Sequence, residues 1–164
     1  MAETLHDFSA AVENLISINR DAEQGFRAAA DAVGDPGLKQ MFVQLSAQRA
    51  AFAAEIQDGV RRLGFEPANP LGTGGTLHGI WIALKSAILA NKAHATLEET
   101  ERGEDLALKT YRDCMGMILQ PELRTILERQ YALIQESHVA IRTMRDQTAP
   151  PPTTPPATAP PTNP

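Results

Sequence analysis

The stretch GLKQMFVQLSAQRAAFAAEIQDGVRRL, residues 37–63, carries the pattern that decides the fold. Apolar side chains recur in it at spacings of four and three, which is typical of a helix with one buried face. These positions are Leu38, Phe42, Leu45, Phe52, Ile56, Val60 and Leu63. Arg49 falls on the same stripe, midway along it. Because a buried charge is costly unless it is paired or metal-bound, Arg49 marks the level at which a functional layer is expected.

Three further segments carry apolar stripes of the same kind. They are Glu3–Val33, Asn91–Ile118 and Pro121–Gln147. Near their midpoints the stripes contain Glu23, Glu104 and His138, so four charged or titratable side chains are predicted at one level of a helix bundle. No segment alternates apolar and polar residues for long enough to form a strand, and the fold class is therefore predicted to be all-α.

The connections between these helices differ in length. Gly34-Asp35-Pro36 provides a helix end, a cap and a first-turn proline, which predicts a short turn and an antiparallel hairpin. Gly64–Gly75 is rich in Gly and Pro and is expected to be an exposed loop. The apolar spacing within Leu77–Leu89 predicts a short amphipathic helix that packs across or along the bundle, with Trp81 as its anchor or as a ligand-stacking surface.

The chain changes character near its end. Residues 147–164 consist mostly of Pro, Thr and Ala, hold eight of the twelve prolines and contain no charged residue. Such a composition cannot form a core of its own, so we predict one domain over residues 1–146 and a disordered tail over residues 147–164. The Pro-x-x-Pro spacings leave a role as a ligand for another protein open.

Composition excludes several classes of function. The formal net charge is −5 and the basic residues are scattered among acidic ones, so no nucleic-acid partner is expected. The first residues lack a basic and apolar leader, and no apolar run approaches the roughly 18 residues that a membrane span needs, which predicts a cytoplasmic protein with no membrane partner. The single cysteine, Cys114, rules out an internal disulfide and is predicted to be a small buried residue.

Four separated phrases of the chain resemble one family. They are INRDAEQGF at Ile18–Phe26, Gln48-Arg49, LHGIWIALKSA at Leu77–Ala87 and ERGED at Glu101–Asp105. They resemble the uncharacterised bacterial four-helix-bundle family known as domain of unknown function 2383, over about residues 4–146. That family belongs among the ferritin-like proteins, so the resemblance implies a ferritin-like four-helix bundle with a helical crossover and no established activity. Two hairpins joined by one long connection are the topology of such a bundle.

The resemblance also suggests where metal ligands would stand. Ferritin-like di-iron proteins use a Glu from each of two helices and a Glu-x-x-His from each of the other two. Glu104 with Tyr111 seven residues later fits the Glu-x6-Tyr pattern of that superfamily, and Glu23 fits the equivalent Glu. In the last helix, Gln135 takes the place of the carboxylate that would precede His138.

The second helix departs furthest from the metal pattern, because Arg49-Ala50-Ala51-Phe52 contains neither expected ligand. A guanidinium stays charged and would repel metal ions, whereas it pairs well with carboxylates. We therefore predict that no metal is bound and that a core polar layer replaces the metal site. Its predicted members are Glu23, Arg49, Glu104, Tyr111, Gln135 and His138.

Three functional hypotheses follow from this sequence. The first is a non-catalytic structural or interaction module that needs no cofactor. The second is a metal protein with a reduced site, in which Glu23, Glu104 and His138 hold one iron or manganese ion for storage or oxidative-stress defence. The third is an adaptor whose tail recruits a partner while the bundle dimerises. The sequence leaves a homodimer and the identity of any protein partner open.

Overall fold

The computed structural model describes residues 2–67, 75–117 and 120–149. All regular elements in these ranges are helices, which confirms the all-α prediction. They are α1 (Ala2–Ala32), α2 (Pro36–Arg62), α3 (Gly75–Leu89), α4 (Ala93–Met115) and α5 (Pro121–Gln147). None of the helices in the described ranges is both long and apolar enough to cross a membrane.

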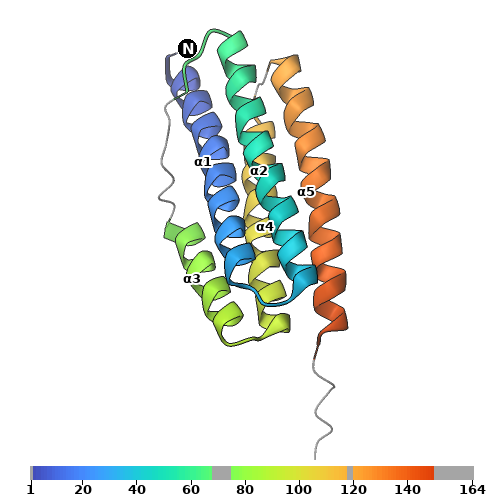
Figure 1. Cartoon of the computed structure of the whole chain (residues 1–164). Coiled ribbons are helices and arrows are strands. Elements are labelled where there is room, and N and C mark those ends of the chain that lie inside the picture. The colour runs from blue at the N-terminus through green and yellow to red at the C-terminus, as the bar shows by residue number, and fades with distance from the viewer. Residues whose placement is uncertain (1, 68–74, 118–119, 150–164) are drawn as a thin grey trace, which may run out of the picture.

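The four long helices pack side by side, and the shorter α3 lies along the outside of α1 and α4 (Figure 1). Around the bundle, α1 neighbours α2 and α4, and α5 neighbours the same two helices. The pairs α1 and α5, and α2 and α4, therefore face each other across the two diagonals. Both α1–α2 and α4–α5 are antiparallel hairpins (Figure 1).

Several helix ends lie where the turn signals predicted them. Asp35 caps α2 by accepting a hydrogen bond at Oδ1 from the backbone N–H of Leu38 at 2.8 Å, and prolines open α2 and α5. The helix predicted from Asn91 begins two residues later, because Asn91 has φ of 52° and separates α3 from α4. Its predicted end at Ile118 lies outside the described residues, and α4 ends at Met115.

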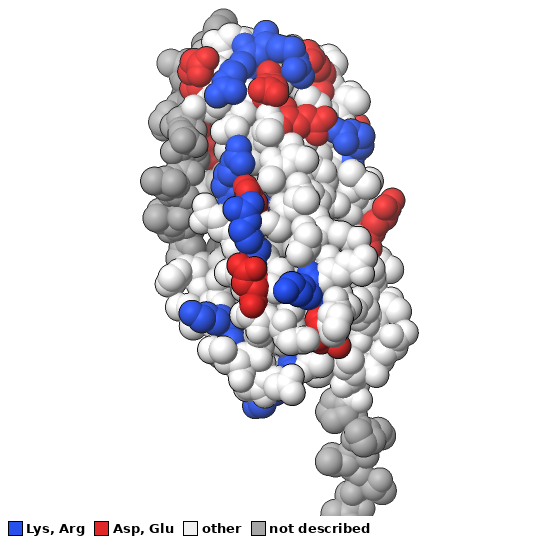
Figure 2. Space-filling view, in the orientation of Figure 1, with Lys and Arg blue, Asp and Glu red and all other residues white. Residues whose placement is uncertain are grey.

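Charged side chains are spread unevenly over the surface (Figure 2). They gather at the end of the bundle where α2 ends, and there Arg61 and Arg62 form exposed ion pairs with Asp58 and Glu122. A column of charged side chains also runs down the left-centre of the face shown in Figure 2, and the area to the right of this column is largely uncharged.

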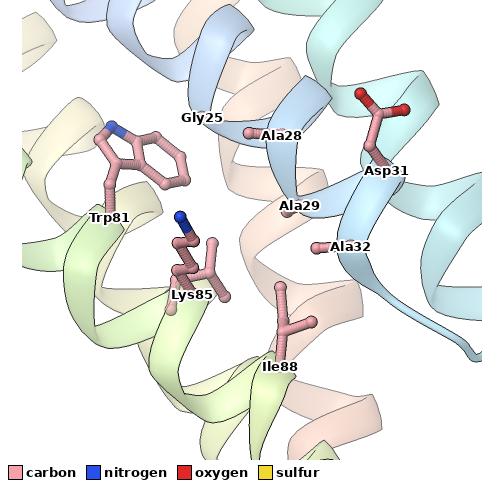
Figure 3. Close-up of a pocket in the computed structure, with 9 residues that line it drawn as sticks. Gly25, Ala28, Ala29, Asp31, Ala32, Trp81, Lys85 and Ile88 are labelled. Atoms are coloured by element: carbon pink, nitrogen blue, oxygen red, sulfur yellow. The ribbon is translucent and has the colours of Figure 1, made fainter.

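Helix α3 is attached to the bundle through Trp81. Its indole meets the Phe26 ring edge-on, with centroids 5.2 Å apart, and lies against Gly25 of α1 (Figure 3). A Cβ atom at position 25 would lie 2.2 Å from Cε2 of the indole, so only glycine lets α3 approach α1 this closely. The prediction of Trp81 as a packing anchor is confirmed.

The core consists of two apolar clusters on either side of a polar level. One cluster includes Leu15, Phe52 and Leu127, and the other includes Phe26, Phe42 and Leu97. Between the two clusters along the helices lie buried polar side chains, among them those of Asn19, Arg49 and Glu104. This level is the candidate site.

Candidate functional site

The centre of the polar level is an ion pair between Arg49 of α2 and Glu104 of α4. Nη2 of Arg49 donates to Oε1 of Glu104 at 2.5 Å, and each side chain is 1% exposed. The two helices are diagonal to each other, so both side chains reach across the middle of the bundle. A buried, charge-assisted hydrogen bond of this kind fixes the relative position of α2 and α4.

Both oxygens of Glu104 are occupied. The second oxygen, Oε2, accepts a hydrogen bond of 2.7 Å from the hydroxyl of Ser137 in α5. The Arg49 guanidinium also lies 5.7 Å from the centre of the Phe52 ring, within the range of a cation–π contact. Nε and Nη1 of Arg49 have no hydrogen-bond partner within the described ranges, and we expect ordered water at these buried donors.

A second set of contacts at this level forms a hydrogen-bonded chain through all four long helices. Nδ2 of Asn19 in α1 donates to the hydroxyl of Tyr111 in α4, and that hydroxyl donates to Oε1 of Gln130 in α5, both at 2.8 Å. Nε2 of Gln130 then donates to Glu55 of α2 at 2.7 Å. Each helix contributes one member, so the chain favours one register of the four helices over others.

Burial shifts the titration of two side chains near this level. Burial raises the pKa of the Tyr111 hydroxyl well above its ordinary value, and the Arg49 charge opposes the shift only in part. Burial also raises the pKa of the Cys114 thiol to about 11. Both groups are therefore neutral at physiological pH, and Cys114 is a buried, protonated thiol as the sequence predicted.

Glu23 lies at the edge of this level and does not pair with Arg49. It forms ion pairs with Arg20 at 3.1 Å and Arg27 at 2.9 Å, both on its own helix. The backbone carbonyl of Glu23 accepts a hydrogen bond from Ser46, which ties α1 to α2. Of the two glutamates predicted to share the layer with Arg49, only Glu104 therefore pairs with it.

His138 faces α4 rather than the ion pair. Its Nε2 lies 2.8 Å from Oδ1 of Asp105 and 3.7 Å from Oε1 of Glu101. Glu101, which is buried, also pairs with Arg145 of α5. These contacts form a separate seam between α4 and α5, near the surface of the bundle.

The prediction that Gln135 belongs to the layer is wrong, because Gln135 is exposed. Ile134 is fully buried, and the next residue of a helix points about 100° away from it. The α5 residues that do reach the layer are Gln130 and Ser137. Sequence reasoning missed both of them, and it also missed Asn19, although each lies three or four residues from buried apolar residues of its own helix.

The arrangement has no obvious metal-binding chemistry in the part of the chain that the structure describes. No three His, Cys, Asp or Glu side chains are grouped there so that they could hold an ion. Glu104 has committed both oxygens to Arg49 and Ser137, and the guanidinium occupies the centre. The residues present therefore do not fit the dinuclear site that a ferritin-like pattern implies.

One comparison with known proteins is informative. The family model described as "Domain of unknown function (DUF2383)" matches residues 7–117. This range holds most of α1 and all of α2 to α4, with Asn19, Arg49, Glu104 and Tyr111, whereas α5 follows it. The resemblance expected over about residues 4–146 is thus shown for residues 7–117. No curated protein matches the chain.

Proposed function

The chain belongs to the DUF2383 family, and we propose that it is a non-catalytic structural or interaction module with a ferritin-like four-helix topology. In this proposal the buried layer keeps the four helices in register and binds no metal. The observation that carries it is the Arg49–Glu104 pair, in which both side chains are buried and the guanidinium lies at the centre of the bundle.

The ion pair supplies the attraction that a metal would otherwise supply. In a di-iron bundle, cations at the centre draw carboxylates from several helices together. Here the fixed positive charge of Arg49 attracts Glu104 from the opposite helix, and Ser137 supplies a further hydrogen bond from α5. Removing either charged partner would leave the other buried without compensation, which is strongly destabilising.

The reduced metal site of Glu23, Glu104 and His138 is the weaker candidate. Glu23 is paired with arginines of α1, and His138 is paired with Asp105. All three side chains would have to leave their present partners before they could bind one ion. The proposed module therefore binds no iron or manganese. From the composition, we further propose that it is cytoplasmic and has no nucleic-acid or membrane partner.

Elemental analysis tests the proposal directly. The full chain is expressed in medium supplemented with iron and manganese, purified without chelator and measured by inductively coupled plasma mass spectrometry. We expect well under 0.1 metal ion per chain, and the same content in a Glu104→Gln variant. One or two ions per chain in the parent, lost in Glu104→Gln, would overturn the proposal.

A further inference from the structure

A groove of about 430 Å³ opens between α2 and α5. It lies in the half of this helix pair nearer the end of α5, from Gly37 to Gln48 along α2. In the other half, ion pairs of Arg62 with Glu122 and of Arg129 with Glu55 join the two helices. These ion pairs limit the groove to one half of the helix pair. Ser137, whose hydroxyl binds Glu104, lies at the end of the groove nearest the middle of the bundle.

None of the ten residues that line the groove is charged, although 21% of the chain is. The floor is apolar and includes Met41, Leu45, Ile141 and Met144. Methionine side chains adapt to irregular apolar surfaces, so this floor can accommodate apolar rings of a ligand, such as those of proline, at varied positions. The groove fits an uncharged occupant, because a charged one would lose its hydration without gaining a partner.

One wall of the groove is a ladder of amides. Gln40, Gln44 and Gln48 follow each other at intervals of four residues, so they share one face of α2. Oε1 of Gln48 is buried and has no hydrogen-bond partner among the residues that the structure describes. Each amide also carries two N–H donors. A segment rich in proline and threonine is the complementary ligand, since its backbone carbonyls accept from the amide N–H groups and a threonine hydroxyl can donate to Oε1 of Gln48.

We infer that this groove is the docking site of the chain's own C-terminal segment, residues 150–164. The segment has eight prolines and no charged residue. It starts directly after the described residues end at Ala149, five positions beyond Met144 of the groove floor. An extended polyproline segment covers about 3.1 Å per residue, so its fifteen residues span about 47 Å. The stretch from Gln40 to Gln48 needs only about 12 Å of helix axis.

A second groove, of about 350 Å³ between α1 and α3, fits this segment less well (Figure 3). Lys85 of α3 and Asp31 of α1 line it, and its other α1 residues are glycine and alanine, with no amide donors. The segment's composition prevents it from forming a core of its own, but it does not prevent docking on an existing surface. The inference does not depend on whether the polar layer binds metal.

Paramagnetic relaxation tests the docking in the full chain. A nitroxide is attached to an Ala157→Cys variant, since the buried Cys114 thiol resists labelling, and the methionine methyl groups carry ¹³C. We expect the oxidised label to reduce the Met41 methyl signal at least threefold and to leave Met115, which packs in the other half of the core, unchanged. A further Ala140→Glu substitution in the labelled chain places a charge in the groove and should restore the Met41 signal.

Val139→Glu is the matched control, because Val139 is exposed and does not line the groove. It should leave the broadening of Met41 in place, whereas broadening by mere proximity of the label would survive both substitutions. An unbroadened Met41, equal effects of the two substitutions, or broadening only between labelled and unlabelled copies in a mixed sample would each overturn intramolecular docking. In the last case a second copy would be the source of the segment.

Discussion

Arg49 and Glu104 are paired at 2.5 Å although the helices that carry them do not pack against each other. Their side chains span the diagonal between α2 and α4, where shorter residues would leave a cavity. The pair is therefore both an electrostatic contact and part of the packing at the centre of the bundle. Ser137 satisfies the remaining oxygen of the carboxylate.

Replacing Arg49 with alanine should lower the free energy of unfolding by about 3 to 5 kcal/mol, because Glu104 would remain buried and unpaired. Arg61→Ala is the matched surface change, since Arg61 is half exposed and its pairs are worth less than about 1 kcal/mol. Urea denaturation followed by circular dichroism measures both values. Equal shifts of the two midpoints would show that the buried pair does not stabilise the fold.

The combination Arg49→Met with Glu104→Gln separates charge from volume. Both substitutions keep most of the side-chain volume, and together they remove both buried charges. We expect the double variant to be at least 2 kcal/mol more stable than Arg49→Met alone, in line with about 3 to 5 kcal/mol for breaking a buried pair. Additive effects of the two substitutions would exclude coupling between these residues.

Much of the fold could be predicted because its signals are local. Apolar spacing, the cap at Asp35 and the prolines at 36 and 121 set the helices and most of their ends. The layer was harder to predict, because helical phase fixes which way a side chain points. Gln135 matched the motif but lies one residue from the buried stripe, whereas Gln130 has the right phase and matches no motif.

Gly25→Ala should destabilise the chain despite the better helix propensity of alanine. The new methyl would lie 2.2 Å from the Trp81 ring, whose position is also fixed by Phe26. Overpacking of this kind costs about 1 to 3 kcal/mol, more than the gain of about 0.5 to 1 kcal/mol from removing a helical glycine. Thermal unfolding measures the loss, and tryptophan emission should shift to longer wavelength as α3 separates from α1.

Gly79→Ala is the control for this prediction. Gly79 also lies within a helix, but a Cβ atom there would have no described residue within 4 Å. Alanine should therefore stabilise the chain by about 0.5 to 1 kcal/mol. If Gly25→Ala raises the melting temperature as Gly79→Ala does, the close contact of Gly25 with Trp81 is absent in solution.

Tyr111→Phe interrupts the hydrogen-bonded chain through the four helices. It leaves Oε1 of Gln130 without its donor, while Nδ2 of Asn19 keeps the carbonyl of Leu15. An unsatisfied buried acceptor costs about 1 to 3 kcal/mol. Tyr131→Phe, at a half-buried position, should change stability by less than about 0.5 kcal/mol. Denaturation of the two variants gives the loss in free energy of unfolding for each, and a larger loss in Tyr111→Phe shows that the Tyr111 hydroxyl stabilises the fold.

Alkaline pH should weaken the fold through Cys114. Burial raises the pKa of this thiol from 9.0 to about 11, so above pH 9 the unfolded chain loses the proton while the folded chain keeps it. The unfolded state then binds fewer protons, and stability falls as pH rises through this window. A Cys114→Ala variant should be less stable at pH 8 and lose less stability between pH 9 and 11. Parallel pH dependences of parent and variant would contradict the shift.

A designed metal site tests whether Arg49, Glu104 and Ser137 converge as the structure places them. Arg49→His with Ser137→Glu would direct an imidazole and a second carboxylate toward Glu104, since both original side chains contact that residue. An imidazole is shorter than a guanidinium side chain, but a zinc ion between two ligands adds about 4 Å of reach. Without metal, the two neighbouring carboxylates repel, and we expect a lower melting temperature than in the parent.

Added Zn²⁺ should restore stability to this variant, because an ion that binds only the folded state shifts the equilibrium toward it, by about 2.7 kcal/mol at 100 times the dissociation constant. The matched control is Arg49→His with Gln135→Glu. Gln135 is exposed, so its carboxylate cannot join the imidazole and Glu104 at the centre of the bundle. Scanning calorimetry with and without Zn²⁺ should therefore show a rise in melting temperature for the first pair of substitutions only. An equal response of the two variants would mean that Ser137 and Gln135 are equally distant from the ion pair, and that the phase of α5 in the layer differs from the one described.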